Sequence, residues 1–94
     1  MQGLYKEYLV ETFLASSEQS EKKIRVRPVA GQGLPVTMRV ECSSSMRRSH
    51  PIGTKFLIMG KITDKEGGSP FIYSSFKWKY RVVNDAEAAS FLAR

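Results

Sequence analysis

The chain has 94 residues, a hydrophobic fraction of 41%, a charged fraction of 26% and a formal net charge of +6. This length predicts one domain, residues 1–94, with one modest core and a composition typical of soluble globular proteins. The positive charge favours an anionic partner such as nucleic acid or an acidic protein, although charge of this size also serves solubility alone.

Two absences bear on the compartment. No apolar run approaches the roughly 20 residues that a membrane-spanning helix needs, and the first residues lack the cationic and apolar regions of a secretory signal. The single cysteine, Cys42, cannot form an internal disulfide. We therefore expect no membrane partner and a reducing, cytoplasmic setting.

Residues 4–15 admit two interpretations. As a strand, the segment places Tyr8, Val10, Thr12 and Leu14 on one face. As a helix, it presents an apolar stripe at i, i+4 spacing. We favour the strand because the rest of the chain indicates β structure and no clear N-cap precedes the segment.

Two alternating strands are predicted next. After a polar loop at residues 16–23, Ile24 to Pro28 alternates, with Arg25 and Arg27 on the outer side, and the proline ends the strand. A turn at residues 30–35 contains two glycines that can adopt positive φ. Residues 36–42 then alternate again, with Arg39 on the outer side.

Residues 43–51 combine serines with Arg47, Arg48 and His50. The arginine forks and hydroxyl donors suit phosphate, and a solvated connection is the simpler alternative. We expect a loop, because the composition is poor for a helix. No second histidine or cysteine pair stands at ligand spacing, so no metal site is predicted.

The strand at residues 55–62 has apolar residues on both faces, which is typical of a central or doubly covered strand. Gly60 interrupts it and indicates a bend or a close backbone approach. A long turn at residues 63–70 predicts an antiparallel hairpin with the strand that follows.

Residues 71–83 are expected to be one aromatic-rich strand. From Phe76 onward, Trp78, Tyr80 and Val82 fall on an inner face, and Lys77, Lys79 and Arg81 fall on an outer one. Residues 84–94 are rich in helix formers and predict a short C-terminal helix or a frayed tail. Asn84 with Glu87 resembles a capping box.

These elements predict an all-β fold: a small five-stranded antiparallel, strongly bent sheet or barrel, OB-like or SH3-like, with a short C-terminal helix. The OB plan often has a helix between its third and fourth strands, and the expected loop at residues 43–51 counts against the standard form.

We expect a non-catalytic binding module without a cofactor, since the chain has one His, one Cys and no recognisable catalytic motif. Nucleic acid, single-stranded or bound through its backbone, is the favoured partner. Tyr73 is a candidate for base stacking. The alternative is a protein-interaction or homo-oligomeric module, because the strand at residues 55–62 carries more apolar surface than one core can hide. The candidate nucleic-acid residues are Arg25, Arg27, Arg39, Arg47, Arg48, Lys77, Lys79, Arg81 and Tyr73.

Overall fold

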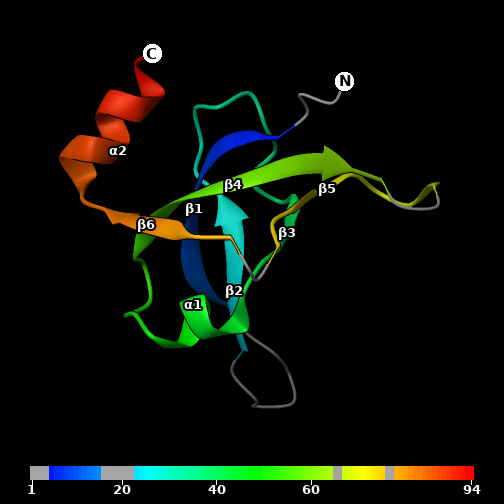
Figure 1. Ribbon diagram of the computed structural model, residues 1–94, viewed down its shortest axis with the longest axis horizontal. Helices are drawn as coiled ribbons and strands as arrows, with labels where there is room; N and C mark the ends of the chain where they lie inside the picture. The colour runs from blue at the N-terminus through cyan, green and yellow to red at the C-terminus, as the bar shows by residue number, and fades with distance from the viewer. Residues whose placement is uncertain (1–4, 16–22, 65–66, 76–77) are drawn as a thin grey trace.

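The computed structural model describes residues 5–15, 23–64, 67–75 and 78–94. It contains six strands in a mixed, open sheet and two helices (Figure 1). In chain order these are β1 (Lys6–Ala15), β2 (Lys23–Pro28), β3 (Arg39–Glu41), α1 (Ser44–Arg48), β4 (Lys55–Thr63), β5 (Phe71–Tyr73), β6 (Tyr80–Val83) and α2 (Asp85–Leu92). The all-β character and the C-terminal helix agree with the sequence prediction.

β1 settles the choice between strand and helix in favour of the strand. It pairs antiparallel with β2 through its second half and with β4 through its first half. Tyr8, Val10 and Thr12 are buried on the shared face predicted for them, while Leu14 is exposed. β2 ends at Pro28, as expected for a residue without an N–H to continue the ladder.

β4 is the central strand, as its two apolar faces predicted. Its first half pairs with β1 and β6, and its second half pairs with β5 in the predicted antiparallel hairpin. Gly60 lies where these partners change. A Cβ at Gly60 would come within 2.8 Å of the carbonyl oxygen of Tyr73. Glycine is therefore required by close backbone approach, one of the two roles predicted for it.

The purely antiparallel, five-stranded arrangement is wrong in detail. β3 pairs parallel with β5, so the sheet order is β2-β1-β4-β5-β3, and β6 adds a sixth strand beside β4. β3 is also shorter than the predicted strand at residues 36–42. The N–H of Met38 donates to the carbonyl of Pro35, which makes residues 35–38 a turn and leaves Val36 exposed.

A helix replaces the loop expected at residues 43–51. The hydroxyl of Ser43 accepts the N–H of Met46 at 3.4 Å and caps α1, and the two arginines lie in its last turn. Met46 is 1% exposed, so its burial anchors the turn in the core. Tertiary burial and the cap override the weak helix propensity of the segment.

The single strand predicted over residues 71–83 is also wrong. The chain forms β5, leaves the sheet after Tyr73 and returns as β6 on a different part of β4. Tyr80 and Val82 do take the same face as Phe56, but at the edge of the sheet, and they remain 37% and 46% exposed. The expected aromatic row is therefore not a buried core, and Phe76 lies outside the described residues.

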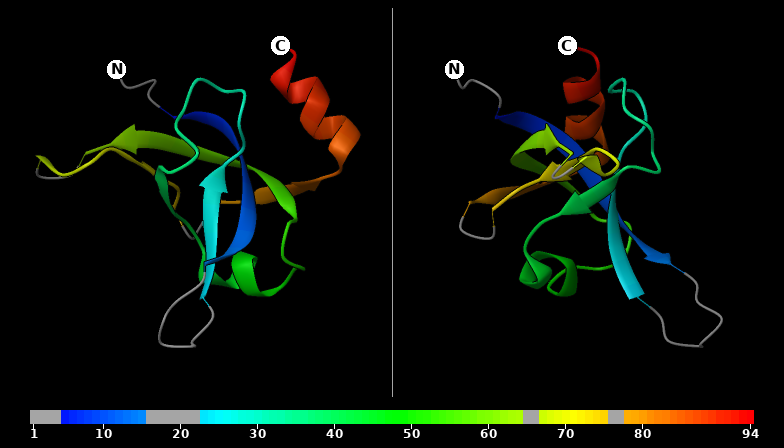
Figure 2. Two further views of the ribbon diagram at one scale, coloured as in Figure 1. Left: turned by 180° about the vertical axis from the view of Figure 1, so that it is seen from behind. Right: turned by 90° about the vertical axis from the view of Figure 1, so that its right-hand side faces the viewer.

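Two clusters of buried side chains stabilise the fold. The main core lies inside the curled sheet and contains Tyr8, Val10, Val26, Val40, Met46, Phe56, Ile58 and Ile72. The smaller core lies on the other face, where α2 packs through Ala88 against Leu9, Leu57 and Val83 (Figures 1 and 2). The predicted capping box is present, with Asn84 and Glu87 each accepting the other's backbone N–H. No helix in the described residues is long and apolar enough to cross a membrane.

Candidate nucleic-acid interface

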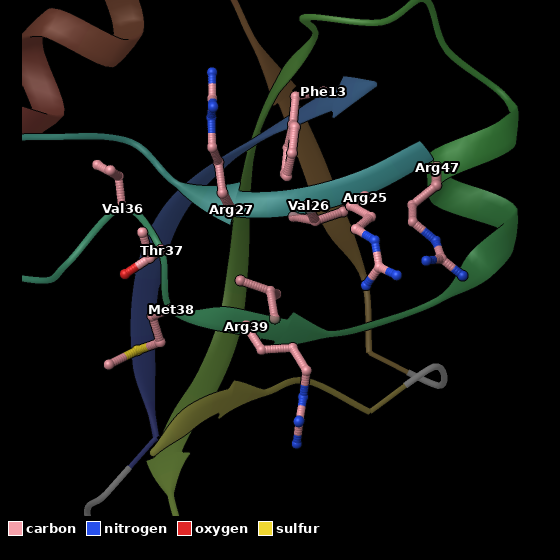
Figure 3. A pocket seen from close by; sticks show the side chains of 10 residues that line it. Phe13, Arg25, Val26, Arg27, Val36, Thr37, Met38, Arg39 and Arg47 are labelled. Atoms are coloured by element: carbon pink, nitrogen blue, oxygen red, sulfur yellow. The ribbon is translucent and has the colours of Figure 1, made fainter. Parts of the chain in front are cut away.

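A pocket of about 470 Å³ opens where the curled sheet fails to close, between β2 and β3 (Figure 3). We call it the arginine groove. Among the described residues, its lining includes four arginines and no acidic residue. The lining residues are Phe13, Arg25, Val26, Arg27, Val36, Thr37, Met38, Arg39, Val40 and Arg47.

The alternation of β2 and β3 explains why arginines line this opening. Val26 and Val40 point into the core, so the neighbouring Arg25, Arg27 and Arg39 point to the outer side. Arg47 comes from α1, and its Nη1 donates to the carbonyl of Ile24 on β2 at 3.4 Å. The unexpected helix therefore brings a fourth cation beside the predicted strand.

The four arginines have different directions in the groove. In Figure 3, Arg25 and Arg47 lie side by side and point the same way, while Arg39 projects from the far side of β3. Arg27 points the opposite way, and its guanidinium lies 4.6 Å from the ring centroid of Phe13. The guanidinium of Arg39 lies 4.5 Å from the centroid of Phe71 on β5. The four arginines therefore surround the groove from β2, β3 and α1 and do not all point into it.

Ion pairing divides the same residues into two classes. Arg27 Nε pairs with Glu11 at 2.9 Å, and Arg39 pairs with Glu41 at 3.4 Å. Within the described residues, no carboxylate pairs with Arg25 or Arg47. Arg25 and Arg47 are therefore the groove arginines whose positive charge no carboxylate of the described residues offsets through an ion pair.

The other predicted site residues lie elsewhere or outside the description. Arg81 is on β6 and pairs with Glu87 on α2 at 3.6 Å. Arg48 and Lys79 are exposed and do not line the groove, and Lys77 lies outside the described residues. Tyr73 is 37% exposed on β5, where it contacts Trp78. Of the predicted stripe, the described residues Lys79 and Arg81 thus do not line the groove.

The groove also contains residues that the sequence did not single out. Phe13 pairs with Arg25 in the β1–β2 register, so it lies beside the arginines on the same face. Val36 and Met38 contribute apolar surface from the turn before β3. The sequence alone does not show that Phe13 lies beside the alternating arginines of β2. Its place in the site follows only from the β1–β2 register, which pairs Phe13 with Arg25.

The single cysteine and the single histidine of the chain have different neighbours. Burial raises the pKa of the Cys42 thiol to about 11, with Arg47 acting weakly in the opposite direction. His50 contacts the hydroxyl of Tyr80 at 3.3 Å and packs on the ring of Phe56. Among the residues that the structure describes, no three His, Cys, Asp or Glu side chains could together hold a metal ion.

Part of the apolar surface that suggested an oligomer is covered within the chain. Leu57, on the second face of β4, is 4% exposed because α2 covers it. Met59 on the same face remains 40% exposed, and so does Ile62 on the opposite face. The homo-oligomeric module therefore stays an alternative prediction.

No family model matches the chain, and neither the curated proteins nor the solved structures include a significant match.

Proposed function

We propose that the protein is a non-catalytic nucleic-acid-binding module whose arginine groove holds the phosphate backbone. The observation that carries the proposal is that Arg25, Arg27, Arg39 and Arg47 all line one opening, and that no acidic residue lines it in the described part of the chain. Arginine suits this role because its planar fork donates two parallel hydrogen bonds to phosphate oxygens. Backbone contacts of this kind supply most non-specific affinity for nucleic acids.

We also propose that β1 to β5 follow an OB-like plan that is open between β2 and β3. Three features support this: β1 pairs with both β2 and β4, β3 runs parallel to β5, and α1 lies between β3 and β4. In OB-folds, the surface around the second and third strands binds oligonucleotides and oligosaccharides. The arginine groove lies on this surface. The fold analogy alone would not establish the function, which rests on the arginines.

The decisive experiment measures fluorescence anisotropy of labelled oligonucleotides at two salt concentrations. The test variant carries Arg25→Gln and Arg47→Gln, the two arginines without an ion pair in the described residues. The matched control carries Arg81→Gln and Arg94→Gln. These two arginines form ion pairs with Glu87 and Glu7. Both double variants reduce the formal net charge from +6 to +4, since each loses two cations.

We expect the groove variant to lose affinity by roughly tenfold or more, because each arginine makes a charge-assisted hydrogen bond. The slope of log K against log salt should fall by about 0.7 for each phosphate of a single strand that the variant no longer neutralises. The control should bind nearly as well as the unmodified protein. Equal losses of affinity in the two variants would show that only net charge matters and would contradict binding in the arginine groove.

An acidic protein is the alternative partner, and polyglutamate tests it as a competitor. If polyglutamate displaces the oligonucleotide at equal charge concentration, the groove recognises negative charge and not phosphate. Failure of the unmodified protein to bind any oligonucleotide at low salt would overturn the proposal.

A further inference from the structure

A second surface feature lies on the outer face of the sheet near the end of β4. The rings of Tyr5 and Trp78 meet edge to face, with centroids 4.8 Å apart, and the ring of Tyr73 lies 6.2 Å from Trp78. Lys61 Nζ lies 5.3 Å from the Tyr5 centroid, and Met59 borders a small apolar pocket with Tyr5 and Trp78. We call Tyr5, Tyr73 and Trp78 the aromatic cluster.

The aromatic cluster is open to solvent, unlike the two cores. Tyr5 and Tyr73 are 43% and 37% exposed, and Trp78 is partly buried. Edge-to-face contacts bring one ring's edge against another's face, so several ring faces remain unstacked. Tyr80 is a useful contrast, because it is also 37% exposed but packs on Phe56 and His50 on the opposite face of the sheet.

The strand register connects this cluster to the arginine groove. β3 and β5 pair in parallel, with Arg39 beside Phe71 and Glu41 beside Tyr73. Phe71 and Tyr73 share one face of β5 because they are two residues apart. Tyr73 therefore lies about 7 Å along β5 from the ring that the Arg39 guanidinium covers, at about 3.3 to 3.4 Å of rise per residue. Arg39 and Tyr73 therefore lie on one face of the sheet, where Glu41, the ion-pair partner of Arg39, stands beside Tyr73.

We infer that the aromatic cluster stacks unpaired bases of the strand whose phosphates occupy the arginine groove, so that the ligand is single-stranded. This inference rests on the function proposed above. A duplex hides its base faces in the stack, whereas a single strand can present a phosphate to Arg39 and a base to Tyr73. Lys61 adds a cation where the following phosphate would lie. A purely apolar protein partner would leave Lys61 unpaired, which makes the nucleic-acid strand the better occupant.

The test compares two probes with the same phosphates. One is an oligothymidylate of about 12 nucleotides, within the usual site size of an OB-fold. The other is an abasic oligonucleotide of equal length. Trp78 is the chain's single tryptophan, so its emission reports directly on the cluster. We expect oligothymidylate to bind about tenfold more tightly per stacked base and to quench Trp78, and the abasic strand to leave the emission unchanged.

Tyr73→Leu should bring the affinity ratio of the two probes toward one without changing the salt slope. Tyr80→Leu is the matched control and should leave the ratio unchanged. If the abasic strand binds as tightly as oligothymidylate, and binding still depends on Arg25 and Arg47, the inference is wrong while the groove stands. If neither probe binds, both proposals fail. The comparison of probes on the unmodified protein does not depend on any variant folding.

Discussion

The side-chain amide of Gln32 hydrogen-bonds both backbone groups of Leu9. Its Oε1 accepts the Leu9 N–H at 2.8 Å, and its Nε2 donates to the Leu9 carbonyl at 2.8 Å. β2 ends at Pro28, and beyond it the Leu9 carbonyl also accepts the N–H of Val29 at 3.0 Å, whereas the N–H of the fully buried Leu9 donates to Gln32. The amide thus continues the ladder beyond the end of β2, and Nε2 also donates to the carbonyl of Val29 at 2.8 Å.

Replacement of Gln32 by alanine should therefore lower the free energy of unfolding by about 1–3 kcal/mol, because the buried N–H of Leu9 loses its acceptor. Gln32→Glu is the informative companion. A carboxylate can still accept the Leu9 N–H but cannot donate to the two carbonyls, so its stability should also fall. Urea denaturation measures both. An unchanged midpoint for Gln32→Ala would show that water replaces the amide without cost.

Gly60→Ala should destabilise the hairpin of β4 and β5. The added Cβ would meet the Tyr73 carbonyl oxygen at 2.8 Å, a backbone atom that cannot rotate away. Overpacking of this kind costs about 1–3 kcal/mol, which exceeds the ~0.4–1 kcal/mol that comes from restricting the unfolded chain. Thermal denaturation measures the net effect, with the exposed turn variant Ser69→Ala as the control. A gain in stability would mean that β5 moves aside freely.

Strands in which apolar and polar residues alternate could be predicted from the sequence, whereas the strands with which they pair could not. Arg25 and Arg27 were placed correctly on the outer side of β2 by the period of two. Their proximity to Arg47 depends on α1. This helix is stabilised by the Ser43 cap and by burial of Met46 among residues that are distant in the sequence. Weak helix propensity gives no sign of either event.

The segment from Phe71 to Val83 alternates as a strand would, but the structure divides it into two strands, β5 and β6. The alternation continues through Trp78 and Tyr80, yet the chain leaves the sheet after Tyr73 and rejoins it only at Tyr80. Ser74 is buried, its hydroxyl donates to the Met59 carbonyl at 2.6 Å and its N–H donates to the Glu41 carbonyl at 2.8 Å. These long-range bonds end the β5 segment, and nothing local in the sequence marks them. For this reason Lys79 lies outside the described strands and Arg81 lies on β6, while Lys77 is outside the described residues.

Cys42 should make the stability of the protein depend on pH in the alkaline range. Burial raises the pKa of its thiol from 9.0 to about 11. Below pH 9 the thiol is protonated in both states, and its contribution to stability is fully present. Between pH 9 and about 11 the unfolded chain loses the proton first, so stability falls with rising pH.

A shift of this size corresponds to a loss on the order of 2–3 kcal/mol once both states are deprotonated. Other groups also titrate in this range, so the measurement is the difference between the unmodified protein and Cys42→Ala. Urea unfolding at about pH 8 and about pH 10.5 should show a smaller decrease for the variant, because alanine has no proton to lose. Parallel decreases in both proteins would contradict the buried environment of the thiol.

Glu11→Gln should strengthen oligonucleotide binding, because Glu11 is the carboxylate that neutralises one side of the groove. It pairs with Arg27 at 2.9 Å and lies 3.9 Å from Lys55 Nζ. Without it, Arg27 is free to contact phosphate. We expect affinity to rise several-fold at low salt, with the salt slope steeper by about 0.7. Loss of the partly exposed pair should cost at most about 1 kcal/mol of stability.

Glu87→Gln is the matched control, because it also raises the net charge by one but releases Arg81 on β6. Equal gains in affinity for the two variants would show that net charge causes the effect and that Arg27 does not contact the phosphate.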